Sequence, residues 1–69
     1  MKTNNELELM LIELRKLAVT TFASEETADT WLNQKLKLYG DTPIAIAQTK
    51  EGYEQMMRIL NAIIYGGVA

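Results

Sequence analysis

The chain has 69 residues, which is enough for one domain with a thin core, because a domain this small buries only about 60% of the surface that its unfolded chain exposes. It has no Cys and no His, which excludes disulfides and the usual zinc sites, so we expect neither metal nor cofactor. The net charge of −2 argues against direct contact with nucleic acid, whose binders carry a basic face. The first residues are not followed by an apolar segment of signal or membrane length, so we expect a cytoplasmic protein without membrane contact.

A first helix is predicted over residues 5–22, where apolar residues recur at steps of three and four. The residues on this face are Leu7, Met10, Leu11, Leu14, Leu17, Ala18 and Phe22. Three further apolar residues, Leu9, Ile12 and Val19, fall on the other side of the helix at about 100° per residue. Either they form a patch for a homodimer or another partner, or the connector or third helix covers them.

A second helix is predicted over residues 25–34. The Ser24 hydroxyl can accept a hydrogen bond from an open backbone amide at its start, where acidic residues also complement the helix dipole. Ala28, Trp31 and Leu32 are then expected to face inward.

A connector over residues 35–41 follows, in which Leu36 and Leu38 are expected to pack under the domain. The next segment, 43–48, is predicted to be a short third helix. Proline at a first helical position has its φ already set and loses no hydrogen bond, so Pro43 is a good start signal.

A fourth helix is predicted over residues 50–65, capped by Thr49 and ended by Gly66. One apolar arc is formed by Tyr53, Met56, Met57, Leu60, Ile63 and Ile64. Glu54 and Arg58 lie on the polar side, correctly ordered for an ion pair between residues four apart. The four segments together predict an all-α fold, a small four-helix bundle.

The residues needed for catalysis are missing from this sequence. Nucleophilic catalysis needs an activated Ser, Thr or Cys beside a base, yet the chain has no His, no Cys and one Ser, Ser24, which already has a role as a cap. The acidic pair Glu25 and Asp29 is typical of a solvated helix start. We therefore expect a protein that is not an enzyme.

Tyr65 is the feature that most directly suggests protein contact. It is expected on the polar side of the fourth helix near Arg58, immediately before the end Gly66–Ala69, where an exposed aromatic can anchor a partner. The alternative is that Tyr65 packs over the first helix.

Five short segments together form one pattern along the chain. It consists of a Phe before an acidic helix start, then an Ala followed by Trp-Leu, and then a Gly shortly before a Pro. A Thr-x-x-Gly opens the last helix, and a Gly follows that helix directly. The five segments are Phe22–Ala28, Trp31–Leu32, Leu38–Pro43, Thr49–Gly52 and Leu60–Gly66. In this order and spacing they resemble the toxin-binding domain of Xre/MbcA/ParS-type antitoxins, over residues 7–69.

The resemblance implies a module that binds a RES-type toxin, an NAD-consuming enzyme, and occludes its active site with the C-terminal segment. The toxin-binding residues would be Tyr65, Gly66, Gly67, Val68 and Ala69, with Arg58 beside them. The matched residues with a structural role would be Phe22, Trp31, Leu32, Pro43 and Gly52. Family members commonly carry an N-terminal helix-turn-helix domain, whereas residues 1–69 are expected to be a single toxin-binding domain. The alternative function is a self-associating helical module with no toxin partner.

Overall fold

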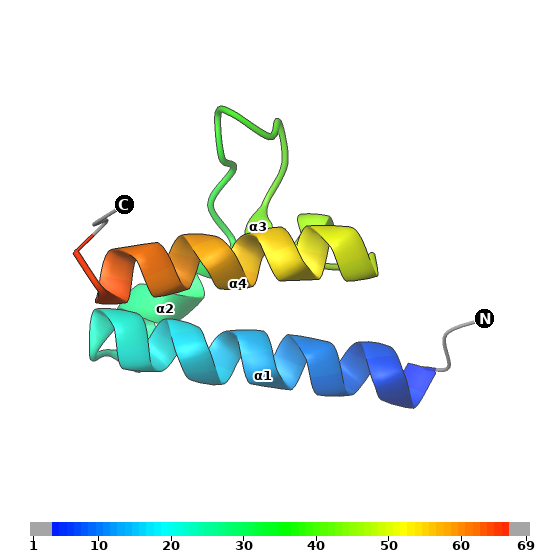
Figure 1. Ribbon diagram of the computed structural model, residues 1–69, viewed down its shortest axis with the longest axis horizontal. Coiled ribbons are helices and arrows are strands. Elements are labelled where there is room, and N and C mark those ends of the chain that lie inside the picture. Colours follow the sequence, from blue (N-terminus) through cyan, green and yellow to red (C-terminus); the bar gives the residue numbers. More distant parts are fainter. Residues whose placement is uncertain (1–3, 67–69) are drawn as a thin grey trace.

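The computed structural model describes residues 4–66, which form four helices (Figure 1). They are α1 (Asn4–Phe22), α2 (Glu25–Leu32), α3 (Pro43–Ile46) and α4 (Lys50–Ile64). Residues 4–66 contain no β-strand, and their only β-type pairing is an isolated bridge between Leu36 and Asp41. The predicted all-helical class is therefore confirmed.

The starts of three helices are set by hydroxyl side chains. The Ser24 hydroxyl accepts from the backbone N–H of Thr27 at 3.2 Å, as predicted for α2. Thr42 caps α3 in the same way, and the Thr49 hydroxyl accepts from the Gly52 N–H at 3.0 Å at the start of α4. Each cap satisfies an amide that has no partner within its own helix.

Two helices end two residues earlier than predicted, and α4 ends one residue earlier, at Ile64. The second helix, expected to reach residue 34, ends at Leu32, because Asn33 closes it: both its backbone N–H and its side-chain amide donate to the carbonyl of Asp29. The third, expected to reach residue 48, ends at Ile46. The Gln48 side-chain amide donates to the Ile44 carbonyl at 3.0 Å, which satisfies an acceptor at the end of so short a helix.

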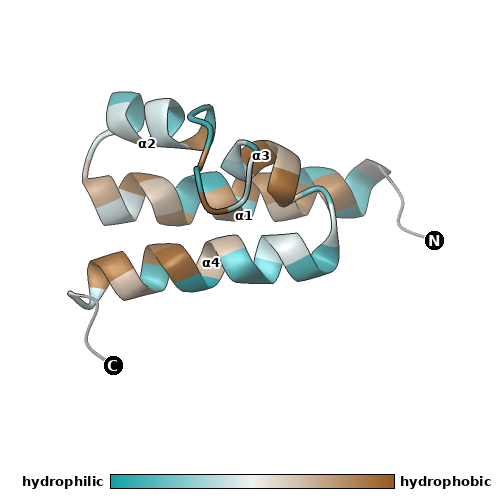
Figure 2. Ribbon diagram, turned by 90° about the horizontal axis from the view of Figure 1, so that it is seen from above, coloured by the Kyte–Doolittle hydropathy of each residue, from teal (hydrophilic) through white to brown (hydrophobic). Residues whose placement is uncertain are grey.

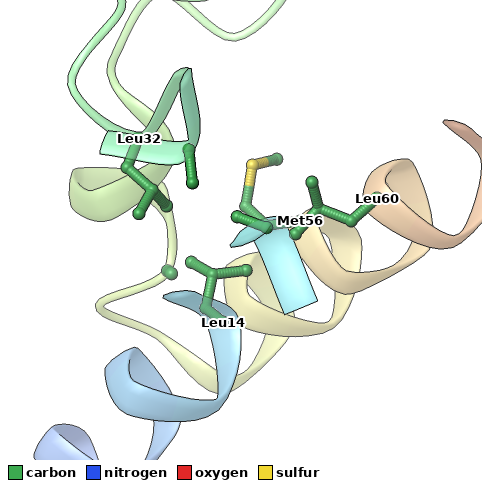
Figure 3. Packing of buried hydrophobic residues seen from close by; sticks show 7 residues of the cluster. Leu14, Leu32, Met56 and Leu60 are labelled. Carbon is green, nitrogen blue, oxygen red and sulfur yellow. The ribbon is translucent and has the colours of Figure 1, made fainter. Parts of the chain in front are cut away.

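The core is built on α1, which packs against both α2 and α4. Figure 2 shows α1 flanked by α2 on one side and by α4 on the other. The buried apolar residues are Leu14 and Ala18 of α1, Ala28 and Leu32 of α2, Ala47, and Met56 and Leu60 of α4. The side chains of Leu14, Leu32, Met56 and Leu60 converge at the centre (Figure 3). All six of these buried residues that lie in α1, α2 and α4 belong to the apolar faces predicted for those helices.

Trp31 was expected to face inward with Ala28 and Leu32, but it is only partly buried and packs on the edge of the core. Its ring lies 5.9 Å from that of Phe22, centroid to centroid, at an angle of 46°. Pro43, by contrast, is buried. The aromatic pair therefore closes the end of the α1–α2 hairpin and does not fill the centre.

Only one of the two leucines in the connector between α2 and α3 packs against the core. Leu36 packs against the core, as expected, but Leu38 is 95% exposed and does not pack under the domain. Gly40 takes a left-handed φ of 72°, and its N–H donates to the Leu36 carbonyl at 2.7 Å. The loop stands away from the helices (Figure 1). Leu38 lies within it, between the bridged residues Leu36 and Asp41, and is exposed to solvent.

Gly52 lies at a close contact between the start of α4 and the end of α3. It is buried in the first turn of α4, and a Cβ added there would overlap the backbone carbonyl of Ile46. Backbone cannot move aside as a flexible side chain can. Any residue other than glycine at position 52 would therefore require the backbone to shift.

We predict that Gly52→Ala destabilises the protein by about 1–3 kcal/mol, the usual range for overpacking. The sign of the change in unfolding free energy tests this prediction, because alanine in place of glycine at an ordinary helix position stabilises a protein by about 0.5–1 kcal/mol. Urea unfolding followed by far-ultraviolet circular dichroism measures the change. Asn61→Ala, on the exposed side of α4, is the control and should shift stability by no more than about 0.5 kcal/mol. Equal or higher stability of Gly52→Ala would contradict the close approach.

We also predict that Trp31→Ala costs about 2 kcal/mol. Truncation of a fully buried aromatic costs about 3–5 kcal/mol, and the partial exposure of Trp31 lowers that figure. The same unfolding experiment measures it. A loss as large as that of a fully buried aromatic would show that Trp31 belongs to the core.

Candidate protein-binding surface

The end of α4 presents three consecutive large side chains to solvent. Ile63 is 45% exposed, Ile64 36% and Tyr65 72%. Successive helical residues point about 100° apart, so these three spread apolar surface around the end of the helix and not along one stripe. The last turns of α4 accordingly show hydrophobic colouring in Figure 2. Ile63 and Ile64 were predicted to lie in the buried arc, but that arc is covered only as far as Leu60.

The helix ends as predicted, at a glycine. The N–H of Tyr65 donates to the Asn61 carbonyl at 3.0 Å and that of Gly66 to the Ile63 carbonyl at 3.1 Å. Gly66 has a φ of 75°, a left-handed value that glycine adopts without steric cost. The chain therefore turns away from the helix axis at this point. The other predicted toxin-binding residues, Gly67, Val68 and Ala69, lie outside the described residues.

Tyr65 and Arg58 share one side of α4. Residues seven apart differ by only about 20° around a helix, so Arg58 lies two turns before Tyr65 on the same face. Both side chains are exposed, and the alternative in which Tyr65 packs over α1 does not occur. The predicted ion pair between Glu54 and Arg58 is not formed. Arg58 is thus an exposed cation on the same face as an exposed aromatic, a combination common at protein interfaces.

The second apolar patch on α1 is smaller than predicted. Leu9 is 60% exposed and Ile12 48% exposed, so neither the connector nor α3 covers them. Val19 is instead partly buried and packs against the core near the α1–α2 turn. The exposed patch on α1 therefore consists of Leu9 and Ile12.

An ion-pair cluster ties α2 to α1. The Arg15 guanidinium donates to both carboxylate oxygens of Asp29, at 3.0 and 3.1 Å, and to Glu25 at 3.5 Å. The hydrogen bonds and the charge of Arg15 lower the pKa of the Asp29 carboxyl, and Asp29 and Glu25 raise the pKa of Arg15. These acids therefore form exposed ion pairs between α2 and α1. Within residues 4–66, no group of three or more Asp and Glu side chains is placed to hold a metal ion.

A hollow of about 400 Å³ lies between the beginnings of α1 and α4. It is lined by Glu6, Leu9, Met10, Lys50, Tyr53 and Glu54. Burial, and to a lesser degree the negative charge of Glu13, raises the pKa of Tyr53. Helical periodicity could not reveal this hollow, because its walls come from segments about forty residues apart. A second hollow, of about 360 Å³, lies between the connector and Ile59 of α4.

Comparison with protein-family models, with curated proteins and with solved structures gives no match to this chain. No helix in the described part of the chain is long and apolar enough to span a bilayer.

We predict that Asp29→Asn destabilises the protein near neutral pH, because it removes the charge paired with Arg15. A carboxyl whose pKa is lowered by folding adds stability above its unfolded pKa, near 3.8, and loses that contribution as the pH falls through the lower folded value. The free energies of unfolding of the two proteins should therefore differ near pH 7 and converge toward about pH 2. Urea unfolding at the two pH values measures the difference. A gap that is unchanged at low pH would contradict the ion pair.

Proposed function

We propose that this protein is a small four-helix bundle that acts in the cytoplasm as an antitoxin, binding a RES-type toxin and occluding its active site with its C-terminal segment. The single observation that carries the proposal is the uncovered end of α4, where Ile63, Ile64 and Tyr65 are all exposed. The nature of the partner comes from the resemblance to Xre/MbcA/ParS-type antitoxins.

A protein partner accounts for this surface better than a small substrate does. The end of α4 exposes Ile63, Ile64 and Tyr65 to solvent, whereas small-molecule sites are concave and enclose most of the ligand. Exposed aromatic and Arg side chains that share a face are typical anchors in protein interfaces. The proposed activity is therefore contact and not catalysis, without direct binding to nucleic acid or membrane.

Occlusion follows from the way α4 ends. At Gly66 the backbone leaves the helix in a left-handed turn, and the next residue in the sequence is again a glycine. A chain with such small residues can enter a cleft that is too narrow for a helix and can exclude substrate by volume. In this mechanism Tyr65 and Arg58 hold the rim of the cleft while Gly67, Val68 and Ala69 fill it.

We predict that deletion of Gly67 to Ala69 separates binding from inhibition. The shortened protein should fold, because the buried core residues within the described range 4–66 all lie between Leu14 and Leu60. It should still bind a co-expressed RES-type toxin in a pull-down, while the toxin regains most of its NAD consumption. If the shortened protein inhibits as fully as the intact one, the helical surface blocks the active site and the segment does not.

We predict that Tyr65→Ala weakens toxin binding by about 1–2 kcal/mol, roughly 5- to 30-fold in Kd, because a rigid aromatic anchor is lost. Tyr39→Ala is the matched control, since Tyr39 is also exposed but lies in the connector. Titration calorimetry with the purified toxin measures both variants. Equal losses for the two would show that the end of α4 is not the anchor.

A further inference from the structure

The outer face of α1 carries two apolar side chains that stay in solvent. Leu9 is 60% exposed and Ile12 48%. Together with Lys16 they follow one another at steps of three and four residues, which places all three on one face of the helix. Nine residues, or about 180° of rotation, separate Leu9 from the buried Ala18, so this face points away from the core.

An open hollow of about 390 Å³ lies farther along the same helix. It is lined by Arg15, Lys16, Val19 and Thr20 of α1 and by Glu25 of α2. Val19, which also packs against the core, supplies apolar surface beside the two basic residues. Leu9 lies seven residues, or about 10 Å, from Lys16 along the helix, so it cannot enter the hollow of its own chain.

The charges on this face change sign along the helix. Glu8 precedes Leu9 and forms no ion pair with any residue in the 4–66 range. Lys16 pairs with Glu13 at 3.5 Å, but both side chains are more than half exposed, and such a pair contributes little and exchanges readily. Arg15 is instead held by the acids of α2. Lys16 is thus the cation on this face that can receive an acid from another molecule.

Antiparallel packing of two copies of α1 brings these features together. When the twofold axis passes Ile12, each residue faces the one that lies equally far beyond the axis in the second copy. Glu8 then faces Lys16 of the second copy, Leu9 faces its hollow, and Ile12 meets Ile12. A parallel pair would set Glu8 against Glu8 and Lys16 against Lys16, so the charges favour the antiparallel arrangement.

We propose that a second copy of this chain packs antiparallel on the outer face of α1, with Leu9 of each copy in the hollow beside Val19 of the other and Glu8 beside Lys16. The pairing is symmetric and contains each of these contacts twice. A stable interface takes about 800 Å² from each partner, and a face with two exposed apolar side chains supplies less, so the dimer is weak. No residue of α4 takes part, and the proposal is independent of toxin binding.

Sedimentation equilibrium of the full chain at low salt, from about 10 μM to about 1 mM, tests this dimer. The apparent mass should rise from 7.8 kDa toward twice that value. Glu8→Lys and Lys16→Glu should each weaken association at least about fivefold, because each sets like charges together at both contacts. Circular dichroism should show an unchanged helical content, since both residues are exposed. Ile12→Glu should abolish association, because it brings two carboxylates together at the twofold axis.

Mixing Glu8→Lys with Lys16→Glu distinguishes this contact from other modes of dimerisation. In the mixed dimer both contacts again join opposite charges, so it should form more tightly than the dimer of either variant alone. Lys37→Glu is the matched control for Lys16→Glu, because it makes the same change of charge at an exposed residue outside this face and should leave association unchanged. The proposal is overturned if the wild type stays at 7.8 kDa throughout, if either charge variant associates normally, or if the mixture associates no more strongly than its components.

Discussion

The burial of one stripe of α1 against two helices at once is the constraint on which this structure depends. Leu14 and Ala18 are fully buried, and the neighbouring residues of the same face contact α2 and α4. A 69-residue chain has too little apolar material for a second layer, so each helix buries one side only. Two of the buried residues, Ala18 in α1 and Ala28 in α2, have small side chains.

The same constraint leaves apolar surface uncovered on α1, at Leu9 and Ile12, and at two further places. α4 extends past its last buried residue, Leu60, and exposes its final turn, while the connector leaves Leu38 in solvent. Scattered apolar side chains are ordinary on a protein surface, but several together at a helix end, or one in a loop that stands away from the helices, favour contact with another protein. The two surfaces differ in character, since one is a helix end on the same face as Arg58 and the other is a loop residue that follows Lys35 and Lys37.

Local signals predicted the helices well because they act within a few residues. The caps at Ser24 and Thr49 and the stop at Gly66 each depend on one side chain and one nearby backbone group. Errors arose where a competing local bond intervened, as at Asn33, which closes α2 two residues earlier than predicted. For the candidate site, the exposure of Tyr65 was one of two alternatives that periodicity left open, and only the packing of the helices decided between them.

By itself, the sequence determined the helical class, the order of the four helices and the face of each that is apolar, since these follow from residue spacing and end signals along one segment. Tertiary structure alone decided how far each apolar face is covered: Leu38 and Ile63 are exposed, Trp31 sits at the edge, and Val19 packs against the core. Whether an apolar helix face is buried depends on which distant segment of the chain packs over it. The path of the chain between α2 and α4 is set by the backbone turn at Gly40 and by the close approach of Gly52 to Ile46. The hollow between α1 and α4 arises in the same way, because its two walls are adjacent only after the chain has folded.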